Sequence, residues 1–326
     1  MIVNLSRDTG VFMRILRALV TVAVTVAGLL PAVLLPATAA SAATVNQTLH
    51  VWTWNVAGQK LNGGATGNGL ITVLGNSIRN RGTDLAAVNE LCWSQYKAIQ
   101  KNLRDSGWPQ DVENFSRFEA TNATGCSGGE QYGIALFSRA PMGTANRITL
   151  PDDGRVEKRK LLCAPLSARP HLRFCTTHIT TLDTTINGAP INVQQLNAVR
   201  AQLEAWNAAG DTVVIAGDFN AQPNYVRLDN WYAPSVSTPN NAGNTGAYRE
   251  LDDTDSRCVG YGENTQDAGT PAGPCGPGKK IDLIFARENR IVGTYDGDSL
   301  SISTDCGGPC SDHRIVIGTV TVAVTT

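Results

Sequence analysis

The chain has 326 residues, of which 42% are hydrophobic and 17% are charged, and its formal net charge is −1. These values are typical of a globular protein and leave room for one large domain or two small ones. A net charge so close to zero excludes an overall electrostatic signature for nucleic-acid binding, although it leaves a local basic cleft open.

The first 43 residues are predicted to form a secretory signal peptide. Arg14 and Arg17 precede an apolar run over residues 18–35, and Ala40-Ser41-Ala42 supplies the small side chains that cleavage requires. A membrane anchor is the alternative, and two prolines in and beside the apolar run disfavour it. We expect residues 44–326 to form one secreted, monomeric domain. This domain should not insert into a membrane, because no later stretch is long and apolar enough to span one.

Cysteine usage supports export. All eight cysteines follow the predicted signal peptide, and an even number in an exported chain favours disulfides. Eight cysteines allow 105 complete pairings, of which the sequential one is the simplest. A metal cluster is the alternative, but no C-x-x-C pairs with metal-ligand spacing occur. The predicted pairs are Cys92–Cys126, Cys163–Cys175, Cys258–Cys275 and Cys306–Cys310.

Strand-like apolar runs alternate with helical patterns after residue 44. We predict strands over residues 49–55, 84–90, 132–137, 161–166, 172–178, 212–218, 281–286 and 314–324. Apolar residues at helical spacing predict helices over residues 70–78, 96–103 and 193–206. Residues 221–280 are rich in loops, which indicates a functional region or an insertion. Strands with intervening helices predict an α/β fold with mixed sheets.

Polar side chains follow or flank the ends of these strands. Any one of them could be a cap or a satisfied polar group of the core. Buried carboxylates are costly without partners, so a convergence of several at one sheet edge would call for a cation. The residues in question are Asn55, Glu90, His178, Asp218, Asn220, Asp282, Asp312 and His313.

These residues lie in short motifs whose order resembles that of the endonuclease/exonuclease/phosphatase superfamily, which includes deoxyribonuclease I. The resemblance covers about residues 48–322. One departure is Asn89 before Glu90, where the family often has glutamine. The resemblance implies an α/β fold, a four-layer α/β/β/α sandwich of two mixed β-sheets. The motifs are Trp54-Asn55, Asn89-Glu90, Thr177-His178, Gly217-Asp218-Phe219-Asn220, Ile281-Asp282 and Ser311-Asp312-His313.

The resemblance also implies a metal site. Glu90 corresponds to the principal ligand of Mg²⁺ or Mn²⁺, with Ca²⁺ as an alternative. Asn55 and Asp312 are expected near that ion. Oxygen ligands of this kind suit hard cations.

Catalytic roles carry over in the same way. Asp218 corresponds to the residue that orients or deprotonates the attacking water, and Asn220 to one that holds the water or a phosphoryl oxygen. His313, paired with Asp282, would contact the scissile phosphate. The carboxylate would favour the charged imidazole, which suits an anionic transition state. His178 would be a second phosphate-binding histidine.

Two further assignments rest on weaker matches. Arg159, in Glu157-Lys158-Arg159, corresponds to an arginine that reaches the phosphate, and a solvated charged turn is the alternative. Tyr132 is a candidate substrate contact and Glu130 a candidate partner of His178, unless both simply lie on the surface.

The resemblance therefore predicts a secreted, metal-dependent phosphoesterase, with nucleic acid as the preferred substrate. A sphingomyelinase-like enzyme and an inositol-phosphate phosphoesterase are alternatives, as is an inactive binding module on the same fold. The adjacent Trp231 and Tyr232 bear on this choice. They could dip into a bilayer, stack on bases or pack in the core.

Overall fold

We describe residues 43–267 and 272–326 of a computed structural model of the chain. Apart from Ala43, the predicted signal peptide lies outside the described residues, so its cleavage stays a prediction. In the described part of the chain, no helix is long and apolar enough to cross a membrane.

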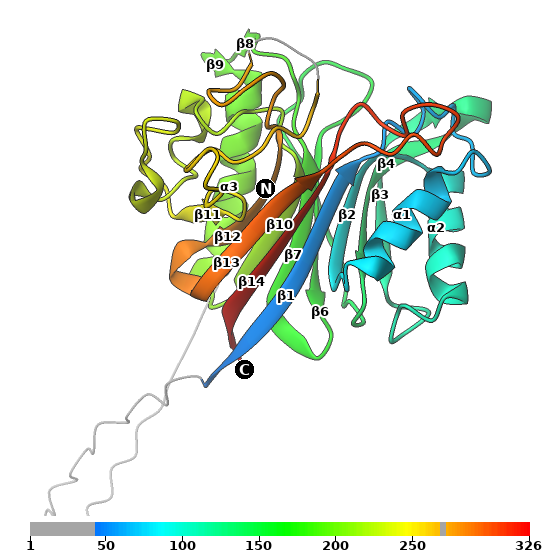
Figure 1. Cartoon of the computed structure of the whole chain (residues 1–326), viewed down its shortest axis with the longest axis horizontal. Coiled ribbons are helices and arrows are strands. Elements are labelled where there is room, and N and C mark those ends of the chain that lie inside the picture. Colours follow the sequence, from blue (N-terminus) through cyan, green and yellow to red (C-terminus); the bar gives the residue numbers. More distant parts are fainter. Residues whose placement is uncertain (1–42, 268–271) are drawn as a thin grey trace, which may run out of the picture. The chain divides into compact units, whose positions relative to one another are not determined.

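Two mixed sheets of six strands each form the centre of the domain (Figure 1). In order, the first sheet contains β13 (Ile291–Leu300), β14 (Ile315–Thr325), β1 (Thr44–Asn55), β2 (Leu85–Cys92), β4 (Glu130–Ser138) and β3 (Ser116–Cys126). The second contains β11 (Tyr248–Glu250), β12 (Asp282–Arg287), β10 (Thr212–Asp218), β7 (Arg169–His178), β6 (Lys160–Leu166) and β5 (Asn146–Thr149). A separate small hairpin pairs β8 (Thr185–Ile186) with β9 (Ala189–Pro190).

Helices cover the outer face of each sheet. The helices α1 (Leu70–Asn80) and α2 (Trp93–Asp105) pack on the first sheet, and α3 (Ile191–Ala208) packs on the second (Figure 1). Short 3₁₀ helices lie at Ser127–Gly129, Val226–Leu228, Pro234–Val236 and Glu288–Arg290. The order of layers is therefore helix, sheet, sheet, helix, and the predicted α/β/β/α sandwich is confirmed.

Alternation along the strands separates three apolar layers. On β1, Val51 faces the layer between the sheets, whereas Trp52 and Trp54 face the layer beneath α1 and α2. On β10, Val214 and Ala216 likewise face the inner layer. Side chains alternate along a strand, so every second residue after these also faces the inner layer. At the ends of both strands, those residues are polar.

Six strands of the described chain are absent from the prediction, and four of them, β5, β8, β9 and β11, have only two to four residues. We did not expect β3 or β13, because their sequences are mostly polar, and β13 contains two glycines. Strand β3 pairs with β4, and β13 pairs with β14. These two strands are therefore held by hydrogen bonds to a neighbouring strand, although their own sequences lack an apolar pattern.

The region 221–280 is loop-rich, as predicted, with β11 as its one strand among the described residues. Trp231 and Tyr232 are fully buried in the layer between the second sheet and α3. Of the three roles open to this aromatic pair, the structure supports core packing.

All four predicted disulfides are present. The denatured but unreduced protein should therefore show no thiol in a titration with Ellman's reagent, because no cysteine is free. The control is the same sample after full reduction, which should show all eight. A reactive thiol before reduction would contradict this pairing.

Candidate active site

The polar residues predicted at strand ends meet at one edge of the inner layer. In the first sheet, Asn55 lies opposite Asn89 across the parallel pair β1 and β2. In the second, Asp218 on β10 lies between His178 on β7 and Asp282 on β12. All five side chains are buried. The two sheets thus bring together residues that are far apart in the sequence.

Asp218 is at the centre of this cluster. Its Oδ2 lies 3.0 Å from Asn55 Nδ2, 3.5 Å from His178 Nε2 and 4.0 Å from His313 Nε2. Its Oδ1 accepts a hydrogen bond from the backbone N–H of Asn220. Burial, followed by the negative charge of Asp282, raises the pKa of Asp218 above its ordinary range. Such a carboxylate is better suited to accept a proton than an exposed one.

Hydrogen bonds between the sheets hold this arrangement. Asn55 Nδ2 donates to Glu90 Oε1 as well as to Asp218, at 3.0 Å in both cases. Asn89 accepts a hydrogen bond from the Asp218 backbone N–H at 2.8 Å and donates to Thr176. We had noted Asn89 only as a departure from the family pattern. Its amide in fact connects β2 to the strands of the opposite sheet.

The backbone at two site residues takes an uncommon conformation. Glu90 has a φ of 60° and Asn220 a φ of 46°, in the left-handed region that few residues other than glycine adopt. Strain of this kind concentrates at functional sites. Close packing also explains Gly217, where an added Cβ would lie 2.3 Å from the carbonyl oxygen of Thr177.

His313 forms a charged pair with Asp282. The distance from His313 Nδ1 to Asp282 Oδ2 is 2.8 Å. Burial alone would lower the pKa of His313, but the charge and hydrogen bond of Asp282, together with the charges of Asp218 and Asp312, raise this pKa to about 10. The imidazole is therefore protonated at neutral pH. It directs its Nε2 toward Asp218 and the side chain of Gln266, a neighbour that the sequence did not reveal.

His178 is the neutral counterpart of His313. Burial, followed by the positive charges of Arg159 and His313, lowers the pKa of His178 well below its ordinary value. Its Nδ1 lies 3.6 Å from Glu157 Oε1, and its Nε2 lies 3.9 Å from Glu90 Oε1. A neutral imidazole and a charged one thus lie near the same carboxylate, that of Asp218.

The weaker assignments have mixed outcomes. Arg159 is buried and bonds to Glu157 at 3.1 Å, so it reaches His178 through that carboxylate. Glu130 accepts a hydrogen bond from the Ser94 backbone at the start of α2, and Glu157 takes the place beside His178 that we expected for Glu130. Tyr132 lies near Glu90, and burial followed by that carboxylate raises the pKa of its phenol.

Asp312 lies at the exposed side of the site. It bonds to Lys60 Nζ through its Oδ2 at 2.7 Å. Burial opposes the charge of Asp312, but this hydrogen bond and the positive charges of His313 and Lys60 together lower its pKa. Next to it, Ser311 donates to the carbonyl of Asn55 and accepts from the His313 backbone N–H. The Ser-Asp-His motif is thereby fixed to the end of β1.

Several of these groups could hold a metal ion. Ligand atoms of Asp218, Asp282 and His313 lie within 4.8 Å of one another. Asp282 and Asp218 already face the imidazole of His313, whereas Glu90 and Asp312 offer further oxygens of the kind that suits a hard cation. Asn55 directs its amide nitrogen toward both Glu90 and Asp218, so in this orientation it links them.

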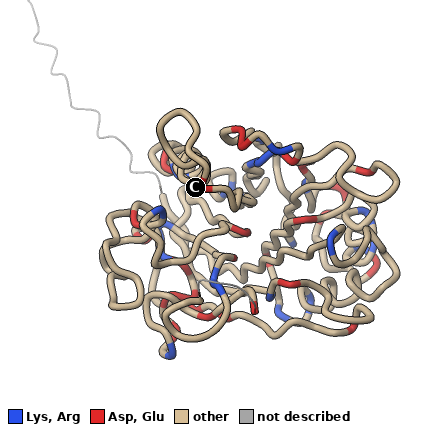
Figure 2. Tube along the Cα trace, turned by 90° about the horizontal axis from the view of Figure 1, so that it is seen from above, with Lys and Arg blue, Asp and Glu red and all other residues tan. Residues whose placement is uncertain are grey.

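Charged residues of both signs are spread along the described chain. Figure 2 shows acidic and basic positions interspersed over the described chain, with no large area of one sign.

The fold matches that of known proteins. The human Nocturnin catalytic domain with bound sulfate superposes with a TM-score of 0.59 at 13% identity, over 86% of this chain and 97% of that one. TDP2 from D. rerio with a single-strand DNA product gives 0.56 at 17% identity, over 84% and 98%. An endonuclease/exonuclease/phosphatase from Bacteroides vulgatus gives 0.56 at 14% identity, over 85% and 99%. A search of curated proteins found no similar sequence.

The family assignment rests on the sequence itself. Residues 52–313 match the Endonuclease/Exonuclease/phosphatase family, and this range includes every site residue described above. Members of the family are phosphoester hydrolases that depend on divalent metals. The chain belongs to the endonuclease/exonuclease/phosphatase family.

Proposed function

We propose that the protein is a secreted, divalent-metal-dependent phosphoesterase that hydrolyses phosphodiester bonds in nucleic acid. The observation that carries this proposal is the buried carboxylate of Asp218 between a neutral and a charged histidine. This arrangement supplies a proton acceptor and a cationic donor at one point, as the attack of water on an anionic ester requires. The predicted signal peptide and the four disulfides support secretion.

Each residue has a role in the proposed reaction. Asp218 orients the attacking water and accepts its proton. His313 donates a hydrogen bond from Nε2 to a phosphoryl oxygen, and Asp282 keeps it charged. His178, which is neutral, binds the phosphate as a hydrogen-bond donor, and Asn220 holds the water or a second oxygen.

Glu90 and Asp312 would hold the metal, with Asn55 keeping Glu90 in place. A bound Mg²⁺ or Mn²⁺ would offset the charge that builds up on the phosphate. The buried side of the site has its own neutralising group in His313, whereas Glu90 on the open side has no guanidinium or ammonium bonded to it among the described residues.

Metal removal provides a direct prediction. Excess EDTA should abolish hydrolysis, and Mg²⁺ or Mn²⁺ should restore it. Glu90→Gln should raise the metal concentration for half-maximal activity at least about tenfold, because it removes the charge of the principal ligand. Glu204→Gln is a matched control, since Glu204 on α3 pairs with Arg287 away from the site. Full activity of the wild type in EDTA would contradict the metal site.

Two observations favour nucleic acid over lipid. Of the structurally similar proteins, TDP2 from D. rerio was solved with a single-strand DNA product. Trp231 and Tyr232, the aromatic pair best suited to dip into a bilayer, are buried. Phosphate contacts would also make the activity fall steeply with salt.

A panel of substrates tests this preference. Plasmid DNA, RNA, sphingomyelin vesicles and inositol phosphates are offered to one preparation with Mg²⁺. We expect turnover of DNA or RNA to exceed that of the other two. Strong turnover of sphingomyelin with intact DNA and RNA would replace the nuclease by a lipid phosphodiesterase, and turnover of inositol phosphates alone would indicate a phosphatase.

A further inference from the structure

A lysine bonds to one of the proposed metal ligands. Lys60 lies in the loop between β1 and α1, and its Nζ is 2.7 Å from Asp312 Oδ2. The side chain of Lys60 is 66% exposed, whereas that of Asp312 is 33% exposed. The contact is thus an ion pair at the open side of the site, between segments far apart in the sequence.

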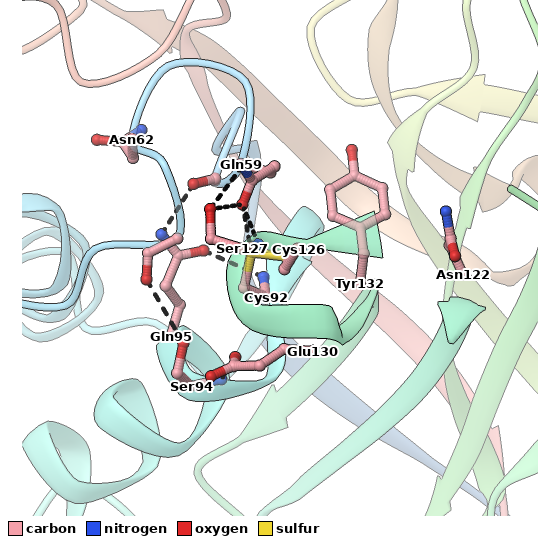
Figure 3. Close-up of a disulfide and its surroundings, with 12 residues drawn as sticks. Gln59, Asn62, Cys92, Ser94, Gln95, Asn122, Cys126, Ser127, Glu130 and Tyr132 are labelled. Atoms are coloured by element: carbon pink, nitrogen blue, oxygen red, sulfur yellow. Dashed lines mark hydrogen bonds between the residues drawn. A yellow bond between two sulfur atoms is a disulfide. The ribbon is translucent and has the colours of Figure 1, made fainter. Parts of the chain in front are cut away.

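The loop around Lys60 is fixed on both sides. Gln59 donates to Ser127 Oγ at 3.0 Å and accepts from the Ser127 backbone N–H at 2.9 Å, beside the Cys92–Cys126 disulfide (Figure 3). Asn62 donates to the carbonyl oxygen of Cys310 at 2.9 Å. These hydrogen bonds on both sides of Lys60 hold its backbone in a defined position.

The partner of Lys60 is fixed by the same part of the chain. Asp312 follows Cys310 by two residues, and Cys310 is bonded to Cys306. The segment around Cys310 therefore anchors the loop that carries Lys60 and also leads directly to Asp312, the carboxylate to which Lys60 bonds.

Glu90 also contributes to the environment of this ammonium. The hydrogen bond to Asp312 raises the pKa of Lys60, and the charges of Asp312 and Glu90 add to this effect. An exposed lysine is charged at neutral pH in any case, and this one is bonded directly to Asp312, one of the two carboxylates that the proposed function assigns to the metal. A +1 charge there lowers the negative potential that attracts a divalent cation.

We infer that Lys60 is a built-in counter-ion of the metal site, which neutralises Asp312 in the metal-free protein and leaves it when a divalent cation binds. This inference rests on the proposed metal site. An ammonium group has only donors, so it cannot share a metal's coordination shell, and Asp312 Oδ2 cannot serve both cations at full strength. The exposed Lys60 side chain can turn into solvent at little cost, because surface ion pairs are weak.

Direct binding of Mn²⁺ tests the inference without any substrate. Metal-free wild type, Lys60→Met and Lys60→Arg are titrated with Mn²⁺ in a calorimeter. Lys60→Met should bind Mn²⁺ about tenfold more tightly, because the competing charge is gone while the length of the side chain is kept. Lys60→Arg should bind like the wild type. Lys101→Met is a matched control, since Lys101 forms a comparable exposed pair with Asp105 on α2.

A second variant identifies the route of the effect. If Lys60 acts through Asp312, the gain from Lys60→Met should shrink in an Asp312→Asn background. Affinity that is unchanged or weaker in Lys60→Met would overturn the counter-ion role and leave the metal site standing. Affinity for Mn²⁺ that survives Glu90→Gln unchanged, or no binding to any variant, would overturn the metal site itself and the role of Lys60 with it.

Discussion

Replacing Asp218 by asparagine should lower turnover by about a hundredfold or more, because it removes the group that accepts the proton from water. Asparagine keeps the size of the side chain and can still accept from the Asn220 backbone N–H, as Asp218 Oδ1 does. What it loses is the negative charge beside two imidazoles. Steady-state kinetics with saturating Mg²⁺ measures the loss.

The fold should tolerate this change. Burial disfavours the charged form of Asp218, so a neutral amide removes an unfavourable charge from the interior. The matched control is Asp211→Asn, directly before the opposite end of β10, where a buried carboxylate pairs with Arg173 and His171. That variant should have a lower melting temperature than the wild type but the same activity. Near wild-type turnover of Asp218→Asn would refute the assigned role.

His313→Ala should have an effect of similar size, on the order of a hundredfold or more in turnover, because it deletes the charged donor that faces the developing phosphate charge. Asp282→Asn should cause a smaller loss, since the imidazole stays in place but is no longer held in its charged form by a carboxylate at 2.8 Å. Both rates are measured with the same substrate and metal.

The chain offers a second histidine–aspartate pair as a control. His171 Nδ1 lies 2.7 Å from Asp211 Oδ1, at the end of β7 farthest from His178. His171→Ala should therefore keep full activity. If His171→Ala and His313→Ala lost activity equally, the loss would come from general destabilisation, and the role of His313 would be wrong.

The centre of the fold could be predicted because its strands carry strong local signals. The β-branched run before Asp218 and the apolar run before Asn89 both lie where predicted, as β10 and β2. Since side chains alternate, the residues that follow inner-layer positions had to face the same layer. That pattern carries Asn55, His178 and Asp218 into the same layer, whereas in the sequence it was the order of the family's motifs that indicated one shared site.

Other parts depend on contacts between distant segments and leave no local pattern. Strand β13 is polar and is held by pairing with β14, so its own sequence does not identify it. Gln266 and Lys60 lie in loops, and nothing near them in the sequence points to His313 or Asp312. Glu157 was visible as part of a charged turn, but only the fold places it beside His178.

The most direct test of the central claim is hydrolysis of bis(p-nitrophenyl) phosphate, a generic phosphodiester that requires no recognition of bases or lipid. Purified wild type is assayed with Mg²⁺ or Mn²⁺. The Asp218→Asn variant, purified by the same procedure, serves as the blank. We expect metal-dependent release of p-nitrophenol by the wild type and almost none by the variant. Equal rates for the two proteins, or no release with either metal, would contradict a phosphoesterase and favour a binding module on this fold.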